Sequence, residues 1–440
     1  MSDVRIENAD LDSALAEAKE AYVARNPRSL ARFVEATAVM PGGNTRTVLF
    51  YAPFPLGFAR GVGARLADLD GHSYIDFLGE FTAGIYGHSH PLIRRAIESA
   101  LDGGINLGGH TPLEARFARA VTERFGLERV RFTNSGTEAN LMALATAVAA
   151  TGRKKIIVFR GGYHGGVFMF RTGHSPVNVP HDFVLARYND NDAPGAAALI
   201  AKHASELAAV LVEPMLGGGG CIPAEPAFLR ALRAATSDAD AVLIFDEVMT
   251  SRLGPHGLAA ELGIRPDLTT LGKYIGGGMS FGAFGGRASL LDLFDPRRPD
   301  ALPHAGTFNN NVLTMAAGLA GLTEVYTPGA AVALSARGEA LRARLNALCR
   351  RAGRALQFTG IGSMMAAHFT TIPIHAPEDV ADIDPRLKDL FFFDLLAQGI
   401  WIAQRGMINL SLTIGDAECD RLTAVVEEFL DTRHALLPAA

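Results

Sequence analysis

The sequence has few cysteines. Its 440 residues contain three, Cys221, Cys349 and Cys419, which lie far apart in the chain. They form no CxxC pair of the kind that holds zinc, and three thiols cannot build the framework of a small disulfide-rich domain. We therefore expect free thiols in a reducing compartment and place the protein in the cytoplasm.

The sequence also lacks long apolar runs and an excess of charge. No stretch reaches the roughly 18 apolar residues that a membrane span requires, and the first residues lack the apolar core of a secretory signal. The net charge of -5 gives no basic footprint for nucleic acid. We expect neither a membrane nor a nucleic acid as a partner.

What the sequence does contain is the composition of an ordinary globular protein, 48% hydrophobic and 20% charged, long enough for two or three domains. From about residue 91 onward, helical and strand patterns alternate, which indicates an α/β fold with a mostly parallel sheet between helices. The expected strands cover residues 129–133, 155–159, 208–213, 241–246, 269–272 and 282–285.

Three regions are expected along the chain. Residues 1–90 form an N-terminal segment of a smaller domain, with helix over 9–39, an irregular stretch over 47–56 and a hairpin that turns at Asp70 and Gly71. Residues 91–330 form the large domain. Residues 331–440 complete the smaller domain as an α+β unit, with long helices and a few strands.

Two strand ends carry the chemistry. An apolar run from Ala241 to Phe245 ends in Asp246, as a buried parallel strand does when it delivers an acid to the carboxyl edge of a sheet. A short β-branched run then ends in Lys273, with glycines behind it. Taken alone, Asp246 would be a strand-end acid of unknown use and Lys273 one surface lysine among many.

A third element is a predicted anion site. Ser135, Gly136 and Thr137 follow an expected strand and open an expected helix, and Ser135 with Glu138 fits a capping box. Free N–H groups at a helix start, beside two hydroxyl groups, suit a phosphate. An ordinary capped helix would show the same residues.

A fourth element is the glycine-rich segment 161–166 around Tyr163. Flanking glycines would let the Tyr163 ring lie against a flat heterocycle, although an exposed aromatic in a turn is the plainer interpretation. His164 is expected to be a structural histidine and not a catalytic base.

Together these four elements suit pyridoxal phosphate. A lysine forms a Schiff base with the cofactor aldehyde and later moves a proton, an aspartate keeps the pyridine nitrogen protonated, a helix start anchors the phosphate, and an aromatic ring stacks on the cofactor.

The joint pattern of 135–139, 162–165, 212–214, 245–248 and 271–273 resembles the class III (ω-type) aminotransferases of pyridoxal phosphate fold type I, over roughly residues 40–430. The resemblance implies an obligate homodimer with active sites at the subunit interface. It also implies that Thr307 reaches the phosphate of the neighbouring subunit's cofactor and that Glu213 is an acid near the cofactor. The alternative for Glu213 is a surface carboxylate at a strand end.

Within this class the sequence is similar to two groups. The tract 246–250 and the segment 41–44 resemble glutamate-1-semialdehyde aminomutase, whereas 48–56, 104–110, 251–258 and 308–311 resemble the aromatic β-amino acid (β-phenylalanine) aminotransferases. The latter resemblance implies that Arg46 binds the substrate carboxylate and that a mobile Arg405 serves a dicarboxylate co-substrate. The candidates for the apolar lining are Val48, Tyr51 and Phe81.

We therefore expect an enzyme that moves the amino group of an aromatic β-amino acid, such as 3-amino-3-phenylpropanoate, to 2-oxoglutarate or pyruvate. The alternatives are an intramolecular aminomutase, an ω-amino acid or amine aminotransferase of the same class, and a cofactor-binding sensor without turnover. A metal at His88 and His90 is not expected, because two histidines on a short loop lack further ligands.

Overall fold

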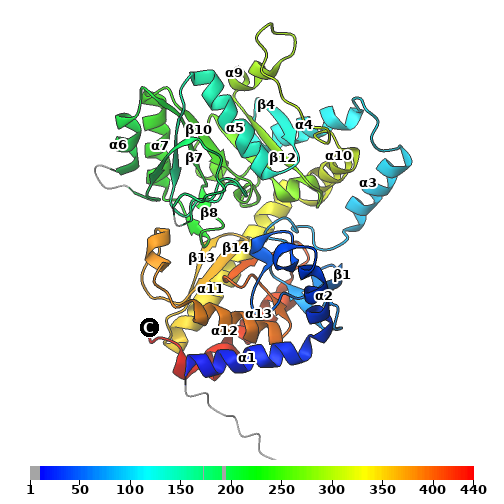
Figure 1. The fold of residues 1–440 in the computed structure, drawn as a ribbon, viewed down its shortest axis with the longest axis vertical. Helices are drawn as coiled ribbons and strands as arrows, with labels where there is room; N and C mark the ends of the chain where they lie inside the picture. The colour runs from blue at the N-terminus through cyan, green and yellow to red at the C-terminus, as the bar shows by residue number, and fades with distance from the viewer. Residues whose placement is uncertain (1–9, 172, 191–194) are drawn as a thin grey trace, which may run out of the picture.

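The computed structural model describes residues 10–171, 173–190 and 195–440. In Figure 1 the large sheet and its helices fill the upper half, while the N-terminal segment, in blue, and the C-terminal segment, in orange to red, lie together below. The strands are β1 Phe58–Val62, β2 Arg65–Asp68, β3 Ser73–Asp76, β4 Arg129–Thr133, β5 Lys155–Phe159, β6 Asp182–Ala186, β7 Leu207–Val212, β8 Met215–Leu216, β9 Ile222–Pro223, β10 Val242–Asp246, β11 Leu268–Gly272, β12 Gly282–Gly286, β13 Gln357–Ile361, β14 Met364–His368, β15 Ile400–Trp401 and β16 Met407–Asn409.

The α-helices follow the amphipathic or apolar runs of the sequence, and several begin at a proline in the first turn, where its missing N–H costs nothing. They are α1 Leu11–Arg25, α2 Pro27–Thr37, α3 Pro91–Asp102, α4 Pro112–Phe125, α5 Gly136–Thr151, α6 Gly195–Lys202, α7 Pro226–Asp238, α8 Leu258–Glu261, α9 Ala288–Leu291, α10 Val312–Ala320, α11 Pro328–Ala352, α12 Pro385–Ala397 and α13 Asp416–Thr432.

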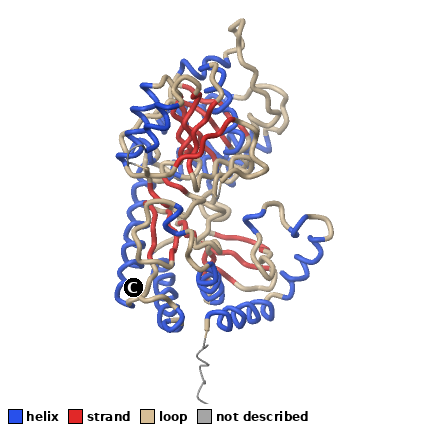
Figure 2. The backbone as a smooth tube through the Cα atoms, turned by 60° about the vertical axis from the view of Figure 1, so that its left-hand side comes forward, coloured by secondary structure: helices blue, strands red, loops and turns tan. Residues whose placement is uncertain are grey.

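Within the described residues, the large sheet has seven strands in the order β4-β12-β11-β10-β7-β5-β6. Strand β12 runs antiparallel to both of its neighbours, and the pairs between β11 and β6 are parallel. The tube in Figure 2 shows this sheet in red, enclosed by blue helices. The expected α/β class with a mostly parallel sheet is confirmed.

Alternate side chains of each central strand face opposite layers of helices. Ile156 and Val158 of β5 belong to the apolar cluster that includes Ala143 and Leu144 of α5. Ile157 belongs instead to the cluster that contains residues of α6 and α7. Both faces are covered, which is why these strands are continuous apolar runs in the sequence.

The lower half joins both ends of the chain. Its four-stranded sheet has the order β1-β2-β3-β15, so Ile400 and Trp401 pair in parallel with Ile75 and Asp76. The expected hairpin is confirmed as β2 and β3. A second sheet has the order β13-β14-β16. The boundaries proposed at residues 90 and 330 stay a prediction.

Three local expectations differ from the structure. The helix expected over 9–39 is two helices, because Pro27 begins a new one after the cap Asn26. The sequence pattern predicts one helix from Thr314 to Tyr326, whereas in the structure α10 passes into a π-helical turn, Gly321–Val325. Strands β1, β6, β8, β9 and β13 were not foreseen.

No helix among the described residues is long and apolar enough to cross a membrane.

Candidate active site

Asp246 ends strand β10, and its carboxylate is held in one orientation. One oxygen, Oδ2, lies 2.8 Å from His164 Nδ1 and accepts a hydrogen bond of 2.8 Å from Asn140 Nδ2. The other, Oδ1, accepts from the backbone N–H of Val248 at 3.0 Å. Asn140 is fixed in turn, since its own oxygen accepts from the Thr270 hydroxyl at 2.7 Å. The strand thus delivers a buried carboxylate whose position is set by three donors.

Lys273 follows strand β11, which pairs in parallel with β10 so that Thr270 lies beside Asp246. Its backbone has a φ of 54°, in the left-handed region. The amine donates a hydrogen bond of 2.9 Å to the carbonyl oxygen of Phe81. Among the described residues no carboxylate lies within ion-pairing distance of this amine.

The surroundings of Lys273 favour its neutral form. Burial lowers the pKa of its amine to about 8, with a further lowering by the Arg405 charge that Asp246 opposes. A lysine of this kind is a nucleophile near neutral pH, because a useful fraction of it carries no proton.

The first turn of α5 lies next to these two strand ends. Ser135 caps the helix, and its hydroxyl accepts from the N–H of Glu138 at 3.2 Å. Glu138 does not complete the expected capping box, because its carboxylate accepts from the N–H of Asn134 and not from that of Ser135. A Cβ atom on Gly272 would lie 3.6 Å from the Cα atom of Gly136, so the start of α5 and the backbone before Lys273 are in contact.

The hydroxyl of Thr137 accepts from the N–H of Gly166 at 3.3 Å, which ties the start of α5 to the glycine-rich segment. In that segment the Tyr163 side chain is 47% exposed. Its backbone N–H donates to Glu213 Oε1 at 3.0 Å, and Gly217 N–H donates to Oε2 at 2.9 Å.

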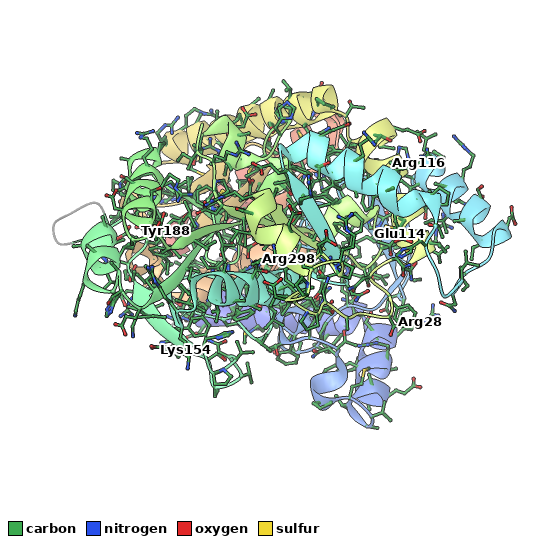
Figure 3. All side chains as sticks on the ribbon, turned by 90° about the horizontal axis from the view of Figure 1, so that it is seen from above. Arg28, Glu114, Arg116, Lys154, Tyr188 and Arg298 are labelled. Carbon is green, nitrogen blue, oxygen red and sulfur yellow. The ribbon has the colours of Figure 1, made fainter. Side chains whose placement is uncertain are left out.

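Glu213 is only 4% exposed, so the surface alternative for this residue is wrong. Burial raises the pKa of its carboxyl to about 7, and the nearby His164 opposes that rise. Tyr188, labelled in Figure 3, supports the same strand end by donating from its hydroxyl to the Glu213 carbonyl at 2.7 Å. Glu213 therefore holds the loop that carries Tyr163.

The two arginines singled out by the resemblance meet at one aromatic ring. The guanidinium carbon of Arg46 lies 5.7 Å from the centre of the Phe81 ring, and that of Arg405 lies 5.3 Å from it. Arg46 also forms an ion pair with Glu80. Arg405 contacts Met407 Sδ at 3.8 Å, and burial lowers the pKa of its guanidinium. Since the Phe81 carbonyl holds Lys273, both arginines lie beside the lysine.

The remaining candidates form no hydrogen bond or ion pair with Lys273, Asp246 or the two arginines in the described part of the chain. Val48 is 44% exposed. Tyr51 is buried in an aromatic core, where its ring lies 4.8 Å from Phe392 and its hydroxyl accepts from the N–H of Leu56 at 2.8 Å. This packing contradicts a lining role for Tyr51, which we no longer propose. Thr307 is exposed on the loop before α10.

Sequence reasoning missed several residues of the site. Asn140 and the carbonyl of Phe81 had no motif to mark them, and His164 was noted without its link to Asp246. Leu49, the neighbour of Val48, packs against the apolar cluster that contains Phe81 and Met407. No burial pattern or spacing in the sequence points to Asn140 and His164 as partners of Asp246, because they lie on a helix and a loop far from it in the chain.

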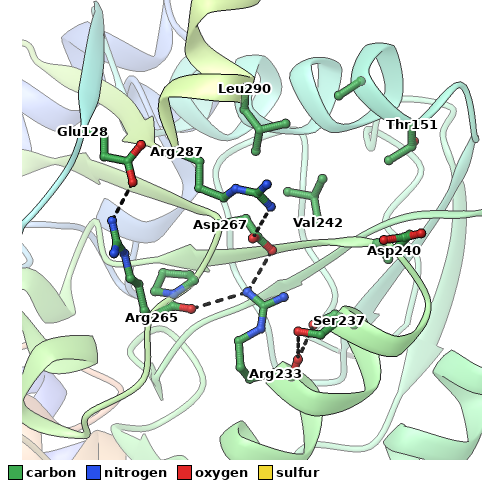
Figure 4. Close-up of a pocket in the computed structure, with 14 residues that line it drawn as sticks. Glu128, Thr151, Arg233, Ser237, Asp240, Val242, Arg265, Asp267, Arg287 and Leu290 are labelled. Atoms are coloured by element: carbon green, nitrogen blue, oxygen red, sulfur yellow. Dashed lines mark hydrogen bonds and ion pairs between the residues drawn. The ribbon is translucent and has the colours of Figure 1, made fainter.

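Two other features lie outside the site. A cavity of about 630 Å³ opens at the opposite edge of the sheet, beside Val242 at the start of β10 (Figure 4). Its arginines are paired, with Arg233 at 2.9 Å and Arg287 at 3.0 Å from Asp267. His88 lies 2.9 Å from Asp76. Among the described residues no group of three or more His, Cys, Asp or Glu is placed to hold a metal ion.

Comparison with known families decides the assignment. The model of the class III aminotransferase family matches residues 51–430. The chain belongs to the class III aminotransferases. It is therefore a pyridoxal-phosphate-dependent aminotransferase, and the expected enzyme class and cofactor are confirmed.

Relatives of this aminotransferase align along nearly its whole length. It is 58% identical to a β-phenylalanine transaminase of Variovorax paradoxus over 434 residues, which cover 98% of this chain and 99% of the relative. It is 38% identical to a glutamate-1-semialdehyde 2,1-aminomutase of Sorangium cellulosum over 396 residues, 86% of this chain and 90% of the relative.

Solved structures agree. A crystal structure of a β-phenylalanine aminotransferase from Variovorax paradoxus superposes with a TM-score of 0.96 at 59% identity, covering 98% of this chain and 100% of the other. The fold is that of pyridoxal phosphate fold type I, as expected.

The residues present in this aminotransferase fit its cofactor. The amine of Lys273 has no carboxylate partner among the described residues and a lowered pKa. Asp246 is a buried carboxylate with three fixed donors. In the first turn of α5 the N–H of Glu138 is capped by Ser135, while those of Gly136 and Thr137 have no acceptor within the helix. This set offers a nucleophile, an anion and an anion-binding helix start at one edge of the sheet, which is what pyridoxal phosphate requires.

Proposed function

We propose that this aminotransferase moves the amino group of an aromatic β-amino acid, such as 3-amino-3-phenylpropanoate, to 2-oxoglutarate or pyruvate. The observation that carries this proposal is Phe81, whose ring contacts two guanidinium groups and whose carbonyl accepts a hydrogen bond from the Lys273 amine. A donor of this kind needs an apolar wall for its aromatic ring and a cation for its carboxylate. Both must lie close to the place where its nitrogen reacts. The named activity of the Variovorax relatives supports the same choice.

The proposed roles are supported by contacts within the site. When bound, pyridoxal phosphate supplies an electron-accepting ring. Lys273 attaches the cofactor and then moves the proton from the substrate carbon, for which its pKa of about 8 suits it. The Asp246 carboxylate keeps the ring nitrogen protonated, because a nearby anion favours the cationic form. His164 and Asn140 fix the orientation of this carboxylate.

The other cofactor contacts are assigned in the same way. Ser135, Gly136 and Thr137 hold the phosphate at the start of α5, and Tyr163 stacks on the ring from a loop that Glu213 fixes. Arg46 and Arg405 bind carboxylates, since guanidinium groups can donate two parallel hydrogen bonds to them.

We further propose a homodimer in which Thr307 of each subunit reaches the cofactor phosphate of its partner. Thr307 is exposed, and its neighbour Phe308 is 55% exposed. Asn310 donates to the Gly109 carbonyl at 3.2 Å and to Glu114, labelled in Figure 3. These bonds join the loop of Thr307 to Gly109 and to the first turn of α4. The segment just before them, 101–107, has the exposed apolar side chains Leu101, Ile105 and Leu107. Burial of such a patch favours association.

Two further proposals concern the division into domains and the cellular compartment. The division at residues 90 and 330 is supported by the pairing of β3 with β15, which unites both ends of the chain. The three cysteines are free and buried, which fits a reducing compartment such as the cytoplasm.

The test is a donor panel with 2-oxoglutarate or pyruvate as acceptor. It includes both enantiomers of 3-amino-3-phenylpropanoate, an α-amino acid and a diamine. We expect turnover of the aromatic β-amino acid and its loss in Lys273→Ala. The aminomutase relative makes isomerisation the competing outcome. Single-turnover spectra in which the amine moves within one substrate molecule, without any acceptor, would overturn the proposal.

A further inference from the structure

A left-handed turn stands beside the Lys273 amine. Gly79, Glu80, Phe81 and Thr82 have φ values of 54°, 47°, 53° and 82°. Residues other than glycine pay roughly 1 kcal/mol or more each for this conformation. The turn is anchored by the Gly84 N–H, which donates to the Gly79 carbonyl at 2.8 Å, and by the Gly79 N–H, which donates to Asp76 Oδ1 at 2.9 Å. Strain of this kind persists where a structure needs side chains in unusual positions.

The turn presents three groups to the site. The Phe81 carbonyl accepts from Lys273, and the Phe81 ring contacts both arginines. The Glu80 carboxylate forms its ion pair with the Arg46 guanidinium. The proposed carboxylate-binding arginine is therefore already covered by a carboxylate of the chain itself.

Arg405 differs from Arg46 in this respect. Its contacts in the described part of the chain are the Phe81 ring and Met407 Sδ, and no carboxylate lies within ion-pairing distance. An incoming carboxylate can approach Arg405 without displacing an anion. At Arg46 it must replace Glu80.

We propose that Glu80 is a specificity-determining residue, whose carboxylate competes with that of the amino donor for the Arg46 guanidinium. This inference rests on the proposed function. Glu80 weakens the binding of carboxylate-bearing donors relative to amines without a carboxyl group, because only the former need Arg46.

The size of the effect follows from exposure. The side chains of Arg46 and Glu80 are 47% and 58% exposed, so water and salt screen their attraction. Exposed pairs of this kind contribute little to stability. Removal of the competitor should therefore tighten carboxylate binding only about two- to fivefold, within the range that such pairs show.

The experiment compares Glu80→Gln with the wild-type holoenzyme. The probe is 3-phenylpropanoate, which carries the ring and the carboxylate but no amine, and its dissociation constant is measured by calorimetry. We expect binding that is about two- to fivefold tighter in Glu80→Gln. The ratio of kcat/KM for 3-amino-3-phenylpropanoate to that for 1-phenylethylamine should rise by the same factor.

Two further variants serve as a matched control and as a second test of the charge. Glu98→Gln removes the partner of the exposed Arg94, 2.8 Å away on α3, and should change neither quantity. Glu80→Asn removes the charge with a residue that tolerates the left-handed conformation, so it should bind the probe at least as well as Glu80→Gln.

Unchanged binding in both Glu80 variants would overturn the inference. Weaker binding would also overturn it, because Glu80 would then orient Arg46 for the substrate. A wild-type enzyme that does not turn over 3-amino-3-phenylpropanoate would instead refute the proposed function.

Discussion

Replacement of Lys273 by methionine should change how the stability of the cofactor-free protein depends on pH. Burial lowers the pKa of the Lys273 amine from its ordinary value of 10.5 to about 8. Between pH 8 and pH 10.5 the unfolded chain therefore binds more protons at this residue than the folded protein does. The free energy of unfolding rises with pH over that interval.

The magnitude follows from the shift. Each unit of pKa corresponds to about 1.4 kcal/mol, so the charged amine costs the folded protein about 3 kcal/mol below pH 8. A protein of this length changes its unfolding temperature by about 1 °C for each kcal/mol. Lys273→Met removes the charge at every pH. The difference in Tm between Lys273→Met and wild type should narrow by about 2 to 3 °C between pH 7 and pH 10.

The assay is thermal unfolding of both cofactor-free proteins across this pH range, followed by intrinsic fluorescence. Titrations that the two proteins share cancel in the difference. Lys154→Met, at an exposed lysine labelled in Figure 3, serves as the matched control and should keep a constant difference from wild type. A constant difference for Lys273→Met as well would refute the reasoning, because the amine would then not lie in a desolvated site.

Three further predictions concern the surroundings of the site. Tyr51→Phe removes the acceptor of the Leu56 N–H, so we expect the free energy of unfolding to fall by about 1 to 2 kcal/mol while the KM for the amino donor stays the same. A raised KM with unchanged stability would show instead that Tyr51 lines the substrate pocket. Asp267→Ala leaves Arg233 and Arg287 without their carboxylate, so Tm should fall by about 2 to 4 °C while kcat stays the same, as steady-state kinetics would show. Asn140→Ala removes a hydrogen-bond donor to Asp246, so the variant should lose its cofactor at least about tenfold faster than the wild type during dialysis, as visible absorbance would show. Equal retention of the cofactor by both proteins would contradict the role of that hydrogen bond.

The positions of Asp246 and Lys273 could be predicted because both depend on a local pattern. Asp246 follows an apolar run and Lys273 a short β-branched run, both of strand length and without alternation, which indicates burial on both faces of a sheet. Parallel strands end at one edge, and β10 and β11 do pair in parallel. The start of α5 was equally readable, because a cap is a property of a few consecutive residues.

The partners of these groups could not be read in the same way. His164 and Asn140 are separated from Asp246 by 82 and 106 positions in the sequence, and no regular spacing predicts such contacts. The aromatic character of Tyr51 and Phe81 was equal evidence for a pocket and for a core, and only packing separated them.

The sequence by itself determined the central strands of the large sheet, the acid and amine at its edge and the helix start beside them, because strand burial and helix capping are encoded by neighbouring residues. The tertiary structure decided what surrounds the amine. The left-handed turn at Phe81 brings two arginines and Glu80 to Lys273, and that meeting depends on how segments from both ends of the chain pack against the large sheet.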